Sequence, residues 1–115
     1  MPTEASPARL TLDIERTEKG AIVRCHGALV YGVGNILYNN VHPLIAGSKH
    51  IVLDLTDLSY MDSMGLGTLV RLYVSAKSSG CRLELVNIGQ RIRHLLELTN
   101  MWEVFATVGE HNVKF

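Results

Sequence analysis

The sequence predicts an α/β fold: a single domain with a four- to five-stranded mixed β-sheet and helices packed against it. Three observations predict this class. The chain has 115 residues, the length of one domain. Two runs near its start alternate between apolar and polar residues, as half-buried strands do. Beyond them, strand-like runs alternate with amphipathic helical segments, which is typical of parallel strands joined by helical crossovers. The predicted order is β-β-α-β-α-β-α-β.

The first two strands are predicted to form a hairpin. Alternation over residues 10–15 and again over 21–29 indicates two strands, and the segment between them is a polar turn. Val23 and Cys25 share one face of the second strand. Residues 1–8 are small and polar and contain proline, so we expect a flexible arm ahead of the domain.

The first helix is predicted to begin at about Gly34 and to stop at Gly47. Pro43 lies inside this segment, where it can either kink the helix or begin a separate final turn. The predicted apolar stripe consists of Ile36, Leu37, Val41 and either Leu44 or Ile45.

Residues 50–55 have the sequence HIVLDL. A continuous apolar run of this kind predicts a central strand that is covered on both faces. The second helix is predicted from about Ser63 to Ser79, because Lys77 and Gly80 provide a C-terminal signal. Its predicted apolar stripe consists of Leu66, Leu69, Val70, Tyr73 and Val74.

The sequence CRLELVNI, residues 81–88, predicts another strand. A third helix is expected over residues 89–102, and Asn100 is suited to end it because asparagine tolerates the left-handed conformation. A short strand at about 104–108 is predicted to complete the sheet. The inward residues of the third helix are predicted to be Ile92, Leu95, Leu96 and Thr99.

The composition disfavours several classes of partner. Eleven Lys and Arg balance eleven Asp and Glu, so no net charge attracts nucleic acid or an anionic membrane. No apolar run approaches ~18 residues and the N-terminus lacks a signal-peptide pattern, which predicts a cytoplasmic protein without membrane insertion. Cys25 and Cys81 lie in apolar runs, so we expect buried, reduced thiols.

The sequence offers no pattern that predicts catalysis or a cofactor. The segments GVGNIL and GLGTLV lack the third glycine of a dinucleotide fingerprint, and neither contains GK[ST]. The five histidines show no metal-ligand spacing. A hydrolase triad built on Ser63 would lack the GxSxG elbow. We therefore predict no catalytic residues, no metal and no cofactor.

The segment MDSMGLG, residues 61–67, allows two interpretations. In the first, Asp62 or Ser63 caps the helix, while Gly65 and Gly67 let it pack closely on a strand. In the second, the glycines leave bare backbone around Ser63, so that a partner can reach its hydroxyl. Because a helix N-terminus tolerates phosphate, such a serine can switch a partner off when it is phosphorylated.

The segment VLDLTDLSYMDSMGLGTLV, residues 52–70, closely resembles the signature of STAS domains, in particular bacterial anti-sigma factor antagonists. The resemblance continues through IRHLLELTNMWEVF, residues 92–105, and through the predicted order of elements. It implies a STAS-like single domain over residues 9–115.

The resemblance also implies a function and a site. Ser63 corresponds to the serine that a cognate anti-sigma factor, a GHKL-type serine kinase, phosphorylates. The unphosphorylated antagonist binds that factor and frees a sigma factor, and a PP2C-type phosphatase resets the switch. The partner-binding residues that it implies are Asp62, Ser63, Met64, Gly65, Leu66 and Gly67.

Two departures from the family pattern accompany this resemblance. Met64 stands where a small residue is usual, and the segment HGALVYGVG, residues 26–34, lacks the acidic residue that many antagonists carry after its first glycine. The alternative function is that of a STAS subunit of a lipid- or solute-transport assembly, which would bind an ABC ATPase without phosphorylation of Ser63.

Overall fold

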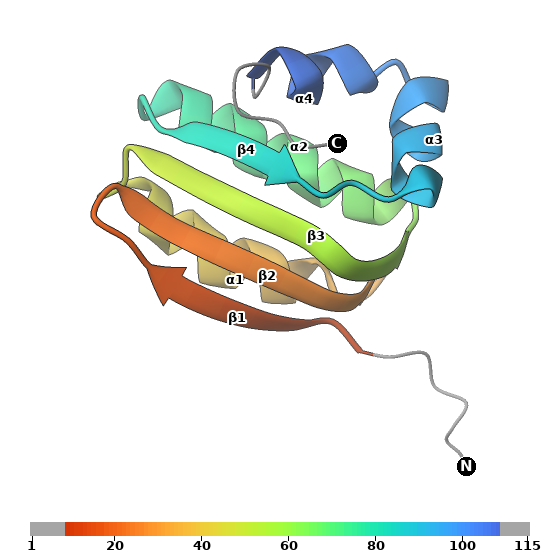
Figure 1. Cartoon of the computed structure of the whole chain (residues 1–115), viewed down its shortest axis with the longest axis horizontal. Helices are drawn as coiled ribbons and strands as arrows, with labels where there is room; N and C mark the ends of the chain where they lie inside the picture. The colour runs from red at the N-terminus through yellow and green to blue at the C-terminus, as the bar shows by residue number, and fades with distance from the viewer. Residues whose placement is uncertain (1–8, 109–115) are drawn as a thin grey trace.

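The computed structural model describes residues 9–108, which form four strands and four helices (Figure 1). The predicted arm over residues 1–8 lies outside the described residues. The elements are β1 (Thr11–Arg16), β2 (Gly20–Leu29), α1 (Gly34–Ile45), β3 (His50–Met61), α2 (Ser63–Ser78), β4 (Arg82–Val86), α3 (Gln90–Leu98) and α4 (Trp102–Val108).

The four strands form one mixed sheet in the order β1-β2-β3-β4. β1 and β2 are the predicted antiparallel hairpin, whereas β2, β3 and β4 are mutually parallel. Because parallel neighbours need crossover connections, α1 joins β2 to β3 and α2 joins β3 to β4. The predicted mixed sheet is confirmed, and β3 is one of its two inner strands.

β3 is longer than the predicted strand over residues 50–55. It continues to Met61 through two register shifts against β2, which lie between Arg24 and His26 and between Gly27 and Ala28. At the second shift, the Ser59 hydroxyl donates a hydrogen bond to the carbonyl oxygen of Gly27. These irregularities break the simple alternation by which a strand is recognised. β3 ends at Met61, one residue before Asp62 caps the start of α2.

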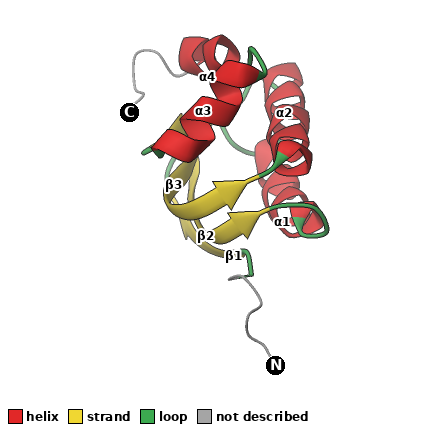
Figure 2. Ribbon diagram, turned by 90° about the vertical axis from the view of Figure 1, so that its right-hand side faces the viewer, coloured by secondary structure: helices red, strands yellow, loops and turns green. Residues whose placement is uncertain are grey.

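One face of the sheet is covered by α1 and α2, which lie behind it in Figure 1 and to its right in Figure 2. Ile51, Leu53 and Leu55 of β3 point into this layer and are at most 1% exposed. Val52 and Asp54, on the opposite face, are only partly buried. The prediction that β3 is covered on both faces was therefore wrong, because α1 and α2 pack on the same side.

The predicted apolar stripes of the helices were partly wrong. In α1, which continues through Pro43, Leu37, Val41 and Ile45 are buried as expected, but Ile36 is 38% exposed. In α2, Val74 is 55% exposed, whereas Leu72 and Ala76 are buried. The inward face of α2 is therefore rotated from the predicted stripe. It consists of Gly65, Leu66, Thr68, Leu69, Leu72 and Ala76, and thus includes small residues that hydrophobicity alone does not select.

The predicted strand at 104–108 was also wrong, because these residues belong to α4. Phe105 is 1% exposed and meets Tyr73 of α2 edge-on, with ring centroids 5.7 Å apart. The preference of valine for strands contributes less free energy than burial of one aromatic ring in the core. Residues 89–102, predicted as one helix, are divided at Asn100, whose φ of 61° ends α3 as expected.

Two other expectations from the sequence agree with the structure, whereas Thr99, predicted to face inward on the third helix, is exposed. Gly80 has a φ of 73° just beyond the end of α2. Cys25 and Cys81 are free and buried, and burial raises the pKa of the Cys25 thiol to about 12. Among the helices of residues 9–108, none is both long and apolar enough to span a bilayer.

His26 connects three strands across the open face of the sheet. Its Nε2 lies 2.9 Å from Oδ2 of Asp13 on β1, and its Nδ1 lies 3.0 Å from Oδ2 of Asp57 on β3. Both ring nitrogens can donate to carboxylates only in the imidazolium form. The hydrogen bond to Asp13 is accordingly the main cause that raises the pKa of His26, against an opposing contribution from desolvation.

We expect the stability contributed by His26 to depend on pH. The pKa of His26 is raised in the folded state, so its stabilisation is present below the unfolded pKa of about 6.5 and is lost as pH rises through the folded pKa. His26→Gln should therefore lower the free energy of unfolding more at about pH 5.5 than at about pH 8.5. Urea denaturation measures this, with exposed His94→Gln as control. A pH-independent loss for His26→Gln would contradict the assignment.

Candidate functional site

The candidate site lies at the edge of the sheet where β2 and β3 end and where α1 and α2 begin (Figure 2). The starts of the two helices are close together. A Cβ atom added to Gly34 of α1 would lie only 2.5 Å from Oγ1 of Thr68 on α2. Glycine at position 34 therefore allows this close approach, which brings the loop after β2 beside the MDSMGLG segment.

Asp62 fixes the start of α2. Its Oδ1 accepts a hydrogen bond from the backbone N–H of Gly65 at 2.9 Å, which caps the helix. Its Oδ2 accepts a second bond from the backbone N–H of Tyr31 at 3.0 Å. One carboxylate thus joins the helix to the loop that follows β2. The cap that the sequence assigned to Asp62 or Ser63 is made by Asp62, so it does not occupy the Ser63 hydroxyl.

The two glycines of the segment have different roles. Gly65 is buried, and a Cβ atom there would overlap the carbonyl oxygen of Leu29 at the end of β2. Gly67 is exposed, and a Cβ atom there would meet nothing within 4 Å. The prediction that both glycines keep the helix surface bare was therefore wrong for Gly65, which packs the helix against a strand, and agrees with the position of Gly67.

Ser63 is the first residue of α2 and is exposed, as the sequence predicted. Met64 beside it is 57% exposed. Gly65 and Leu66 are buried, so they support this surface from beneath instead of forming it. Of the residues that the resemblance implied for partner binding, Ser63, Met64 and Gly67 lie on the surface, and Asp62 is half-buried.

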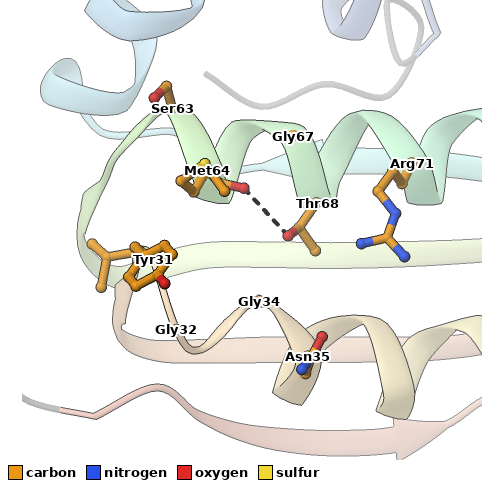
Figure 3. A pocket seen from close by; sticks show the side chains of 10 residues that line it. Tyr31, Gly32, Gly34, Asn35, Ser63, Met64, Gly67, Thr68 and Arg71 are labelled. Atoms are coloured by element: carbon orange, nitrogen blue, oxygen red, sulfur yellow. Dashed lines mark hydrogen bonds between the residues drawn. The ribbon is translucent and has the colours of Figure 1, made fainter.

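A cleft runs between the beginnings of α1 and α2 (Figure 3). In Figure 3, Asn35 of α1 and Arg71 of α2 extend into it, whereas the Ser63 side chain stands at its rim and points away from it. The cleft is lined by Val30, Tyr31, Gly32, Gly34, Asn35, Ser63, Met64, Gly67, Thr68 and Arg71.

Sequence reasoning missed the contribution of Tyr31, Asn35 and Arg71 to this site. Tyr31 and Asn35 lie beside α2 only because β2 and β3 pair in parallel and end at the same edge. Arg71 belongs to α2 itself, eight residues after Ser63. In the sequence, the glycines at 32 and 34 resemble only an incomplete nucleotide-binding motif. A loop with two glycines before a helix was the available signal that this segment approaches another backbone closely.

The cleft lining holds few groups of the kind used in acid–base catalysis. No histidine, cysteine or carboxylate is among the described residues that line it. The carboxylate next to Ser63 in the sequence, that of Asp62, accepts hydrogen bonds from the backbone N–H groups of Gly65 and Tyr31. Within residues 9–108, no group of three or more His, Cys, Asp or Glu side chains is arranged to hold a metal ion. What the site offers is an exposed hydroxyl at the rim of a cleft whose charged lining residue is Arg71.

Comparison with known proteins identifies the family. The model of the STAS domain matches residues 11–112 of the chain. The chain belongs to the STAS domain family. Among curated STAS relatives, the anti-sigma-B factor antagonist of Bacillus subtilis is 27% identical over 95 residues, which are 83% of this chain and 87% of that protein.

Solved structures of the Bacillus anti-sigma factor antagonist SpoIIAA show the same fold. The unphosphorylated form has a TM-score of 0.71 at 18% identity and covers 80% of this chain and 83% of its own. The phosphorylated form has a TM-score of 0.66 at 19% identity and covers 79% of this chain and 85% of its own. The STAS-like fold that the sequence predicted is confirmed.

We expect Gly65→Ala and Gly67→Ala to have opposite effects on stability. The added methyl group at position 65 must displace the end of β2, and such overpacking costs about 1–3 kcal/mol. At position 67 it meets open space, so the higher helix propensity of alanine should stabilise by up to about 1 kcal/mol. Urea denaturation of both variants measures the difference. Similar losses at both positions would show that Gly67 is also packed.

Proposed function

We propose that this STAS protein is a cytoplasmic anti-sigma factor antagonist that switches partners at Ser63. Its unphosphorylated form binds an anti-sigma factor, itself a GHKL-type serine kinase, and so releases a sigma factor. Phosphorylation of Ser63 ends this binding, and a PP2C-type phosphatase restores it. The observation that carries the proposal is the exposed Ser63 at the first position of α2, a helix that is capped by Asp62 instead.

The named relatives support this function. The Bacillus subtilis relative is an anti-sigma-B factor antagonist. SpoIIAA, which has the same fold, is known in an unphosphorylated and a phosphorylated form. A domain of this architecture can therefore carry a phosphate and remain folded.

The start of α2 is suited to accept a phosphate in the free protein. The first turn of α2 contains no acidic residue, and a helix N-terminus carries about +0.5 charge. The exposed position of Ser63 leaves the phosphate in water. Asp62 adds a negative charge beside it, but two backbone N–H groups already bind that carboxylate. The modification should therefore cost the folded state little.

The same phosphate should prevent a partner from binding. The surface around Ser63 includes Tyr31, which is 76% exposed, and Met64, so a partner that covers it replaces water with largely apolar contacts. A phosphate brings roughly −1.5 to −2 charges at pH 7, which would lose their hydration in that interface. A loss of about 3 kcal/mol would already weaken binding by about a hundredfold.

The modified residue can be identified directly. After capture of the kinase partner from cell extract with ADP, the purified pair is incubated with ATP and the phosphopeptides are mapped. We expect phosphate on Ser63. The hydroxyls of Ser59 and Thr68 donate hydrogen bonds to backbone carbonyls and are therefore less available to a kinase. Ser75 lies about three turns further along α2, so Ser75→Ala is the control variant and should be phosphorylated like the wild type. Modification at one of these positions instead would contradict the proposal.

We expect the binding of Ser63 variants to follow their charge. Ser63→Ala should bind the captured kinase like the wild type but resist phosphorylation. Ser63→Asp should bind more weakly, and the phosphorylated protein most weakly, because phosphate carries more charge than one carboxylate. Calorimetric titration compares the four forms. Equal affinities for all of them would favour the alternative, a STAS subunit that binds a transport ATPase without modification.

A further inference from the structure

Arg71 supplies the charge of the cleft beside Ser63. It is the charged side chain among the ten described residues that line the cleft. It lies on α2 eight residues after Ser63, which places the two about 12 Å apart along the helix. No ion pair joins its guanidinium to a carboxylate within residues 9–108. Its charge is therefore available to a molecule that enters the cleft.

An aromatic stack holds this guanidinium in place. The Arg71 Cζ lies 4.1 Å from the centroid of the Tyr38 ring. Tyr38 is itself stacked on His42, one turn further along α1, with ring centroids 4.8 Å apart and an interplanar angle of 19°. A guanidinium over an aromatic face keeps the N–H groups at its edge free to donate. The group is thus positioned before any ligand arrives.

The rest of the cleft adds no opposing charge. The first turn of α1 contains no acidic residue, and no side chain caps this helix. Asn35 contributes a neutral amide at the opposite wall. At the end near Ser63, Tyr31 and Met64 present exposed apolar surface. The cleft is therefore positive and polar at one end and apolar at the other.

We propose that the cleft receives an acidic side chain of the protein partner that docks on Ser63, and that Arg71 selects for that partner. This inference rests on the proposed function. The partner places an Asp or Glu at Arg71, about 12 Å along α2 from its contact with Ser63, and an apolar side chain between Tyr31 and Met64. A planar guanidinium binds a carboxylate through two parallel N–H donors, which fixes the register of the docked partner.

Calorimetric titration against the purified GHKL-type kinase tests this inference. We expect Arg71→Gln to weaken binding by about tenfold or more and Arg71→Glu to weaken it further, in line with loss of a charge-assisted pair. Arg71→Lys should keep most of the salt dependence of binding but lose affinity, because an ammonium group cannot bind in the bidentate manner. Arg91→Gln, on the exposed start of α3, is the control and should change affinity less than about twofold. Reversing one acidic residue of the kinase to arginine should restore binding to Arg71→Glu.

The outcomes separate this inference from the proposed function. If Arg71→Gln binds like the wild type while Ser63→Asp remains weak, the role of Arg71 is overturned and the proposed function stands. If the wild type binds no such kinase, both are overturned. A third result would overturn only the claim that the ligand of the cleft is a protein side chain. In that case, inorganic phosphate titrated into the free protein would perturb the Arg71 side-chain NMR signal at submillimolar concentration. The cleft would then be a site for a free anion.

Discussion

The carboxylate of Asp62 connects the two segments from which the site is built. One oxygen caps α2 at Gly65, and the other holds the backbone of Tyr31 in the loop before α1. A buried or half-buried carboxylate is stabilised most when each of its oxygens accepts a hydrogen bond from its own donor. Because Asp62 performs the capping, Ser63 can occupy the next position and expose its hydroxyl. The availability of Ser63 thus follows from the residue before it.

Close backbone packing gives this arrangement its rigidity. Gly65 rests against the carbonyl oxygen of Leu29, and Gly34 rests against Thr68, so neither helix start has room for another methyl group. The buried neighbours of Ser63 therefore fix its position, while Met64 and Tyr31 form the surface that a partner would cover. A group added to Ser63 changes that surface without reaching the packed layer below it. In the proposed function, this separation is what lets phosphorylation of Ser63 change binding while the fold stays the same.

The structure could be predicted from the sequence wherever a regular hydrophobic period or a specific residue type determines it. The hairpin, the parallel crossovers, the exposed Ser63 and the helix ends at Gly80 and Asn100 were all predicted in this way. Tertiary packing decided the rest. Residues 104–108 contain valines but are helical, and this helix buries the Phe105 ring. The inward face of α2 includes Thr68, Leu72 and Ala76, which the predicted stripe did not contain. The cleft could not be foreseen because Arg71 meets Tyr38 only through the packing of α1 on α2.

The proposed switch requires that Ser63 can be phosphorylated without a change in the structure that presents it. The most direct measurement compares the unmodified and the Ser63-phosphorylated protein by urea denaturation and by amide NMR spectra. We expect free energies of unfolding within about 1 kcal/mol of each other, since the helix N-terminus favours the added charge. We also expect shifted amide signals only around residues 30–35 and 62–68. A loss of about 3 kcal/mol or more, with shifts spread through β3 and β4, would contradict it.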